Sequence, residues 1–249
     1  MGGSQVTTYI LDTSGFMHRA YHASKGTPMY TKEGAPVAAI DLFRRMLTKL
    51  RYDQQADRLL AACDSEVYGF RWKLYPEYKA GRPATPEDFA AQRPGMYKVL
   101  EEMGIPAYVA DGYEADDVIG TLAEKETPPV CIISGDKDLC QLVRPGVTVL
   151  NPSKNVMLDC AGVEKAFGVP PNQLVDLLAL EGDSSDNVPG APGVGPKGAL
   201  EIIRKFGTVE NALDHTDQIT NRRYRKALQE NRALILLSKQ LVTICRNIP

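Results

Sequence analysis

The sequence lacks the features that mark several large classes of protein. No apolar run approaches the roughly 18 residues that a membrane-spanning helix needs, and the opening MGGSQVTTY has neither the basic start nor the apolar stretch of a secretory signal. The five cysteines form no CxxC pair, and their odd number argues against a closed disulfide framework. We therefore expect a soluble intracellular protein with no membrane partner.

Common catalytic signatures are also missing. The chain has no GxxxxGKS or GxxxxGKT loop, which argues against a P-loop nucleotide triphosphatase, and no GxSxG nucleophile motif. Its three histidines, His18, His22 and His215, show no zinc-like spacing. His18 and His22 are four residues apart, but packing explains such a pair as well as metal binding does. Chemistry at a site of this protein must then depend on other residues.

Net charge is only −2, yet charge is strongly segregated along the chain. Residues 111–138 hold eight acids and two bases, whereas residues 222–246 hold seven bases and one acid. Such segregation is expected where a polyanion is bound at one surface and meets metal-loaded carboxylates at another. Solvated helix faces are the simpler explanation for either segment taken alone.

Three apolar runs with the composition of β-strands each lead to an aspartate. TTYILD ends at Asp12, RLLAACD at Asp64 and VCIISGD at Asp136, and helix-like segments around 40–51 and 115–126 separate them. This alternation predicts an α/β fold with a mainly parallel central sheet flanked by helices. Because ligands bind beyond the carboxyl ends of parallel strands, we expect all three aspartates to face one crevice.

Further acids fall at spacings that would place them beside these aspartates. Two that are three apart on a helix share a face, and two that are two apart in extended chain point the same way. Helix capping or a turn explains any one of them more simply. The additional acids are Glu114, Asp116, Asp117, Asp138, Asp183 and Asp186.

Convergence of so many carboxylates has an electrostatic consequence. Each close ionised pair would cost about 4 kcal/mol at 4 Å in a partly screened site, so the acids must protonate, spread apart or bind a cation. An all-oxygen ligand set suits Mg2+, with Mn2+ as a substitute, rather than zinc. Two such ions about 3.5 to 4 Å apart suit in-line phosphoryl displacement, which indicates a phosphodiester substrate.

Two other segments have the composition of nucleic-acid-binding sites. FRWKLYPEYKAGRP interleaves Arg71, Lys73, Lys79 and Arg82 with aromatic residues, a mixture that suits an unpaired strand. A surface helix whose bases cover core aromatics would look similar. In NVPGAPGVGPKGALEII, a glycine-rich turn with Lys197 precedes a helix, an arrangement that holds a phosphate without reading bases.

The motifs together resemble one known family. YILDTSGFMHRAYHA, ACDSEVYGFRWKLYPEYKAGRP, DGYEADDVIGTLA, IISGDKDLCQLV and LEGDSSDNVPGAPGVGPKGA occur in the order found in the bacterial 5' nucleases. That family comprises stand-alone flap endonucleases and the N-terminal 5'-to-3' exonuclease domain of DNA polymerase I. The resemblance runs from about Tyr9 to Pro249.

The resemblance implies a PIN-like 5' nuclease fold in two parts. An α/β catalytic core would span residues 1–170, with a helical arch at about 70–95, and a helix-three-turn-helix DNA-binding lobe would span 171–249. It further implies two metal regions, with Asp117 near both. The first region would use Asp12, Asp64, Glu114, Asp116 and Asp136, and the second Asp138, Asp183 and Asp186.

The same resemblance assigns roles to the substrate-binding segments. Lys79 and Arg82 of the arch would reach the scissile phosphate, and Tyr78 would be a stacking residue. Arg71, Lys73 and Lys197 are further DNA-binding candidates. The glycine-rich turn before that helix, called the hairpin below, would bind duplex DNA. It would also bind a K+ ion through backbone carbonyls at Gly193, Val194 and Gly195.

The predicted function is hydrolysis of DNA phosphodiesters by a two-metal-ion mechanism, acting at a 5' flap, a nick or a 5' end during replication and repair. We expect a cytoplasmic, nucleoid-associated monomer, with a DNA polymerase as a partner in cis or in trans. One rival is a haloacid-dehalogenase-like phosphatase, because GDSSD resembles its acidic motif, but Thr13 and Ser14 follow Asp12 where that group needs DxD. A second rival is a non-catalytic DNA-binding module built on the hairpin.

Overall fold

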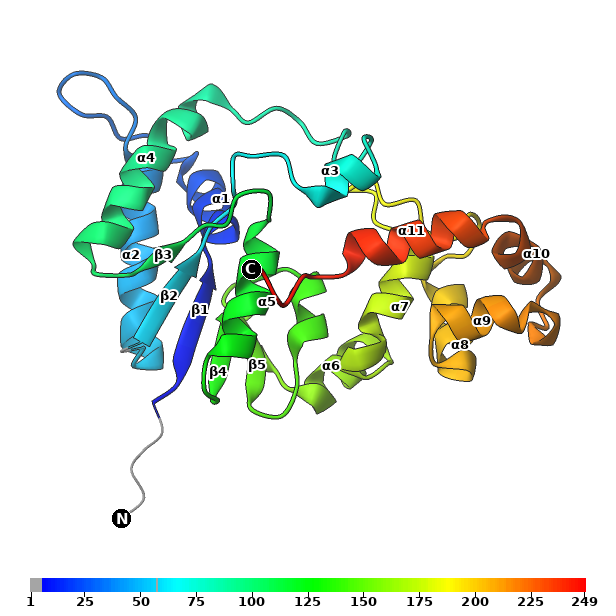
Figure 1. Cartoon of the computed structure of the whole chain (residues 1–249). Coiled ribbons are helices and arrows are strands. Elements are labelled where there is room, and N and C mark those ends of the chain that lie inside the picture. Colours follow the sequence, from blue (N-terminus) through cyan, green and yellow to red (C-terminus); the bar gives the residue numbers. More distant parts are fainter. Residues whose placement is uncertain (1–5, 57) are drawn as a thin grey trace, which may run out of the picture.

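The computed structural model describes residues 6–56 and 58–249 (Figure 1). The first five residues, which are part of the stretch used to judge a targeting signal, lie outside this range. A sheet lies among helices in one half of the molecule, and a lobe made only of helices extends from it. Within the described ranges, no helix combines the length and the apolar character needed to cross a bilayer.

The central sheet has six strands in the order β3-β2-β1-β4-β5-β6, and every neighbouring pair is parallel except β5 with β6. This confirms the predicted mainly parallel sheet. All five residues of β1 are buried, as expected of a strand covered on both faces. The strands are β1 Thr8–Asp12, β2 Arg58–Ala62, β3 Ala107–Tyr108, β4 Val130–Ile133, β5 Val147–Asn151 and β6 Val156–Leu158.

Helices cover the two faces of this sheet and divide the core accordingly. Leu11 of β1 belongs to the cluster formed with α1 Thr13–Ser24, α2 Ala38–Gln54 and α4 Glu87–Glu102. The neighbouring Ile10 points to the opposite face, as strand alternation requires, and packs in the cluster that contains α5 Ala115–Lys125.

The helical lobe shares the second of these clusters. One continuous buried group of side chains runs from Ile10 in β1 through Leu174 to Ile235, so the lobe is packed against the sheet. Its helices are α7 Pro171–Glu181, α8 Pro196–Phe206, α9 Val209–Asp214, α10 Arg222–Glu230 and α11 Arg232–Val242, and α6 Cys160–Phe167 lies between β6 and α7 in the chain. Short 3-10 segments, η1 Asp138–Leu142 and η2 Thr216–Gln218, complete the fold.

The arch region crosses above the sheet between β2 and α4 (Figure 1). Only α3, Phe70–Leu74, is helical within its first part, and residues 75–86 form turns and irregular chain. Lys79 has a left-handed backbone with φ of 58°, and its N–H donates to the Asp186 carbonyl at 2.9 Å. The side-chain amide of Asn187 donates to the Glu77 carbonyl at 2.7 Å. The arch is thus fastened to the loop after α7.

A buried arginine joins the arch to the core and the lobe. Arg71 is only 3% exposed, and its terminal nitrogens donate to the two carboxylate oxygens of Asp117 at 2.6 and 2.8 Å. Its remaining donors reach the backbone carbonyls of Leu241 and Thr243, while the Cys245 N–H donates to Asp117. Arg71 therefore faces the core of this structure, and its DNA contact stays a prediction. The Asp117 oxygens accept from Arg71 and from the Cys245 N–H here, and the metal role of Asp117 likewise stays a prediction.

We predict that Arg71→Ala lowers the free energy of unfolding by about 3 to 5 kcal/mol, because it leaves the Asp117 charge buried without a partner. Urea unfolding of the metal-free protein measures the change. Arg45→Ala is the matched control: Arg45 pairs with Asp41 on an exposed helix face, and its loss should cost only about 0.3 to 0.5 kcal/mol. Equal losses in the two variants would contradict the assigned role of Arg71.

Candidate active site

Five carboxylates lie together at the carboxyl edge of the sheet. Asp12 ends β1, and Asp64 follows β2. The pKa of Asp116 is raised well above its usual value, by burial first and then by the charges of the neighbouring acids. Those neighbours come from three strand ends and the start of α5. They are Asp136, Asp12, Glu114 and Asp64, which together with Asp116 are the five acids predicted for one metal region.

Local hydrogen bonds fix these carboxylates in place. Asp12 caps the N-terminus of α1, accepting from the Gly15 N–H at 2.8 Å and from the Ser134 hydroxyl at 2.6 Å. Burial is the main cause that raises the Asp12 pKa. Asp64 accepts from the Ala115 N–H at 2.8 Å, which ties β2 to the start of α5. Helix capping therefore explains part of this arrangement. The helices that begin at these positions bring the acids together.

The second group of acids lies on a tight loop between α7 and α8. Asp183 and Val188 exchange backbone hydrogen bonds of 2.9 and 2.7 Å, which close the loop. Gly182 and Gly190 cross at its base with φ of 73° and 66°, and a Cβ atom at Gly182 would lie 2.6 Å from the Val188 carbonyl oxygen. Only glycine fits at this crossing. The loop thereby directs Asp183 and Asp186 toward η1.

Asp138 has the side chain best suited to a cation. Its Oδ1 atom is buried and accepts no hydrogen bond, although buried polar atoms are nearly always paired. Burial and then the charge of Asp136 raise the Asp138 pKa to about 7. A cavity of about 20 Å3 adjoins it, which is room for about one water or one small ion. Its acidic lining consists of Glu114, Asp116, Asp138, Asp183 and Asp186.

Side-chain cations of the protein already contact these acids. Lys79 is ion-paired with Glu114 and lies 3.8 Å from Asp186, and Arg82 pairs with Asp186 at 2.5 Å. Among the residues that the structure describes, no three His, Cys, Asp or Glu side chains are arranged to hold a metal ion as they stand. The oxygens nonetheless suit a hard cation, because they are all carboxylates and one is unpaired.

Tyr78 belongs to the arch but points into the protein. Its side chain is buried, with 4% exposed, and its ring packs edge-on to Trp72. The hydroxyl lies 3.1 Å from Glu114 and 3.2 Å from Asp186, between the two acid groups. Burial, followed by the charges of both acids, raises the Tyr78 pKa. The ring of Tyr78 is thus enclosed by protein in this structure, and its stacking role stays a prediction.

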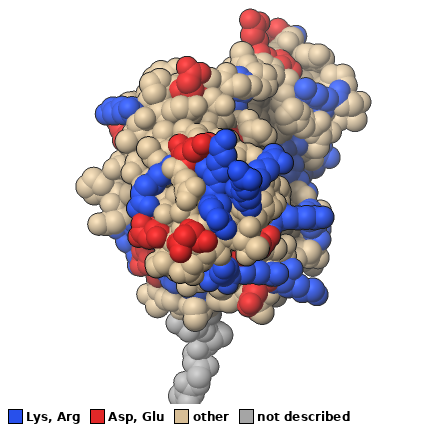
Figure 2. All heavy atoms as spheres, turned by 90° about the vertical axis from the view of Figure 1, so that its right-hand side faces the viewer, with Lys and Arg blue, Asp and Glu red and all other residues tan. Residues whose placement is uncertain are grey.

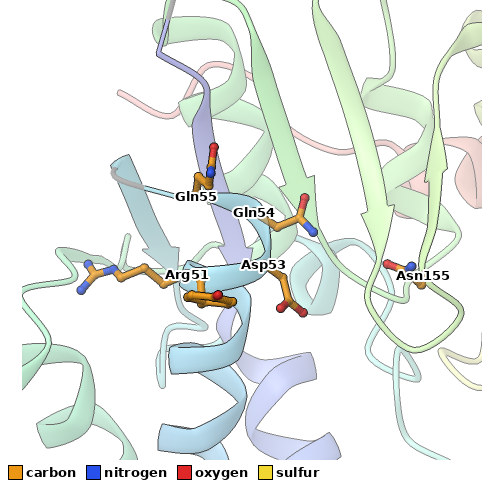
Figure 3. Close-up of a pocket in the computed structure, with 6 residues that line it drawn as sticks. Arg51, Asp53, Gln54, Gln55 and Asn155 are labelled. Atoms are coloured by element: carbon orange, nitrogen blue, oxygen red, sulfur yellow. The ribbon is translucent and has the colours of Figure 1, made fainter.

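A much larger cavity than the one beside Asp138 lies away from the acids. It has a volume of about 1000 Å3 and is found where α2 ends, opposite the turn between β5 and β6 (Figure 3). Asp53 and Gln54 point toward Asn155 across it, whereas Arg51 points outward. Asp53 is already paired with Lys49 at 2.7 Å. Cavity size therefore does not locate the active site in this molecule.

The glycine-rich hairpin forms a basic surface on the lobe. Gly193 turns the chain with φ of 82°, and the exposed Lys197 lies in the first turn of α8. A Cβ atom at Gly193 would lie 3.1 Å from the Arg223 guanidinium, so Arg223 of α10 adjoins the hairpin. Lysine and arginine side chains cover much of this end of the lobe (Figure 2). The sequence indicated a basic surface only through the overall positive charge of residues 222–246, and it did not single out Arg223.

Comparison with known proteins places these features in context. The family model described as the 5'-3' exonuclease N-terminal resolvase-like domain matches residues 7–168, and the 5'-3' exonuclease C-terminal SAM fold matches 169–249. The chain is 42% identical to a 5'-3' exonuclease of Aquifex aeolicus, over 96% of this chain and 81% of that protein. It is 39% identical to DNA polymerase I of Bacillus caldotenax, over 96% of this chain but only 28% of the polymerase.

Solved structures agree with this fold. The T5 5'-exonuclease with bound zinc ions superposes with a TM-score of 0.79 and 22% identity, covering 96% of this chain and 90% of that one. The T5 D15 flap endonuclease in a complex with DNA and metal ions has a TM-score of 0.77 at 22% identity, over 95% and 88% of the two chains. At this identity the likeness establishes the fold alone.

We predict that the metal-free protein becomes less stable as pH rises from about 4 through 7. The folded state keeps a proton on Asp138 up to about pH 7, whereas the unfolded chain loses it near 4, so stability falls as pH rises between those values. Asp138→Asn should flatten this fall. Urea midpoints in EDTA at pH 5 and pH 8 measure it, with the exposed Asp217→Asn as control. A pH dependence unchanged by Asp138→Asn would contradict the assignment.

Proposed function

The chain belongs to the 5'-3' exonuclease family, and from that premise we propose that it is a Mg2+-dependent, structure-specific 5' nuclease acting on DNA with a 5' flap, a nick or a 5' end. One observation carries the proposal. The unpaired, buried Oδ1 of Asp138 lies beside a small cavity lined by carboxylates, and the cations of the arch border the same place. Such a site is suited to a divalent ion and a phosphodiester.

Each of the two groups of acids would hold one metal ion. Asp12, Asp64, Glu114, Asp116 and Asp136 would hold one ion, and Asp138, Asp183 and Asp186 a second. When bound, two such ions activate water and neutralise charge on the transferring phosphoryl group, with Mn2+ able to replace Mg2+. Lys79 and Arg82 now contact Glu114 and Asp186. They would exchange these carboxylates for the scissile phosphate, orienting it for cleavage that leaves a 5' phosphate and a 3' hydroxyl.

The helical lobe would hold the duplex part of the substrate. Gly195 precedes α8, and the exposed Lys197 lies in the first turn of this helix, so the helix start and the lysine charge would together hold a phosphate. Backbone carbonyls of Gly193, Val194 and Gly195 would hold a K+ ion at the same turn. Lys73, exposed on α3, would contact the strand that passes the arch.

The chain would consist of two parts and would work with a DNA polymerase. Residues 1–170 would form the catalytic core with the arch, and residues 171–249 the DNA-binding lobe. Because the matched DNA polymerase I proteins contain this segment within a longer chain, a DNA polymerase in cis or in trans is the proposed partner. We expect a monomer that works in the cytoplasm at the nucleoid, during DNA replication and repair.

Asp116→Ala should reduce cleavage of a labelled 5' flap by about a thousandfold or more, because charge stabilisation worth several kcal/mol depends on the ion it would hold. Duplex affinity, measured separately in Ca2+, should stay near that of the unchanged protein. Asp111→Ala, an exposed acid before α5, is the control.

Full activity of the Asp116 variant would refute the site. Hydrolysis of a small phosphomonoester but not of DNA would favour the haloacid-dehalogenase-like phosphatase. DNA binding without Mg2+-dependent cutting would favour the non-catalytic DNA-binding module.

Replacing Lys197 and Arg223 together with Ala should weaken duplex binding irrespective of base sequence. Each lost phosphate contact should lower the slope of log affinity against log salt by about 1. Fluorescence anisotropy at several salt concentrations measures both effects. The single-turnover cleavage rate at saturating enzyme should be retained, since neither residue lies near the acids. A lower rate with unchanged affinity would contradict a binding role for this surface.

A further inference from the structure

Lys137 is a cation of the site that the proposed mechanism does not use. It stands in the chain between Asp136 and Asp138, and its Nζ atom lies 3.2 Å from Oδ2 of Asp183. The ion pair connects the end of β4 with the loop after α7. Glu181 is also close enough for the two charges to influence each other. Lys137 thus lies beside acids of the proposed second metal region.

Its attachment differs from that of Lys79 and Arg82. Those two residues lie in the turns of the arch, which the loop after α7 fastens by a few hydrogen bonds. Lys137 instead leads directly into η1, where Leu139, Cys140 and Leu142 are almost completely buried. Its backbone therefore cannot move away from the acids without disrupting the core. When the arch cations turn to a substrate phosphate, the backbone of Lys137 stays beside the carboxylates.

We propose that Lys137 is an internal counterion that weakens binding of the second divalent cation, at Asp138 and Asp183. The inference rests on the proposed function. An ammonium group already paired with Asp183 competes for its oxygen and repels an arriving ion of charge +2. With its side chain 44% exposed, Lys137 can swing toward solvent when the ion binds. Its charge then continues to lower the affinity, although less strongly.

Two other roles for Lys137 give different expectations. If it served mainly to hold Asp183 in position, removing it would weaken metal binding, because the ligand would lose its orientation. If it contacted the DNA backbone, removing it would weaken DNA binding and leave metal binding unchanged. The existing hydrogen bonds to Asp183 argue against the first role, since Ser185 holds the same carboxylate through its N–H at 2.8 Å and its hydroxyl at 2.6 Å.

Titration of the DNA-free protein with Mn2+ tests the inference without relying on activity. Calorimetry on Lys137→Gln should show the weaker Mn2+ site tightened by about fivefold or more, as expected for removal of a nearby positive charge. Lys137→Arg, which keeps the charge, should remain within about twofold of the unchanged protein. Lys154→Gln, at the exposed turn between β5 and β6, is the control for the loss of a lysine far from the acids.

An unchanged or weaker Mn2+ affinity in Lys137→Gln would overturn the inference while leaving the proposed nuclease function intact. Loss of duplex affinity in this variant, with Mn2+ binding unaltered, would show a DNA contact and would overturn it as well. If the unchanged protein bound no Mn2+ at all, both the proposed metal sites and the role of Lys137 would be wrong. The calorimetric result therefore separates failure of the inference from failure of the function.

Discussion

Repulsion among carboxylates at one edge of the sheet is the constraint on which the rest of this structure depends. The protein limits it in two visible ways. Burial and neighbouring charges raise the pKa values of Asp12, Asp116 and Asp138, so that some acids keep a proton. Hydrogen bonds from Ser185 and the charge of Lys137 outweigh burial at Asp183 and lower its pKa. Divalent cations would complete the neutralisation that protons and side-chain cations begin.

The fold holds these like charges together despite their repulsion. Parallel strands bring residues that are far apart in the chain to the same edge, and the Gly182–Gly190 crossing fixes the second acid group on a short loop. Arg71 then ties the arch, the start of α5 and the end of α11 into one buried unit. These buried contacts lie next to the site and oppose the electrostatic repulsion among its acids.

Sequence patterns predicted the acid positions well because strand and helix periodicities are local. The three aspartates after β1, β2 and β4 follow from apolar runs and from the geometry of parallel sheets. The partners of Arg71 could not be foreseen, since its acceptors include backbone carbonyls of residues 241 and 243 that only the folded chain brings near. A composition of bases and aromatics looks the same whether the side chains face DNA or the core. For that reason the sequence did not indicate that Arg71 and Tyr78 are buried.

Anomalous diffraction from crystals grown in Mn2+ would test the central claim most directly. We expect two manganese peaks, one among Asp12, Asp116 and Asp136 and the other between Asp138 and Asp183, with Lys79 and Arg82 withdrawn from Glu114 and Asp186. Absence of both peaks, with the acids still paired to these side-chain cations in saturating Mn2+, would contradict it. The protein's own cations would then be sufficient to relieve the repulsion.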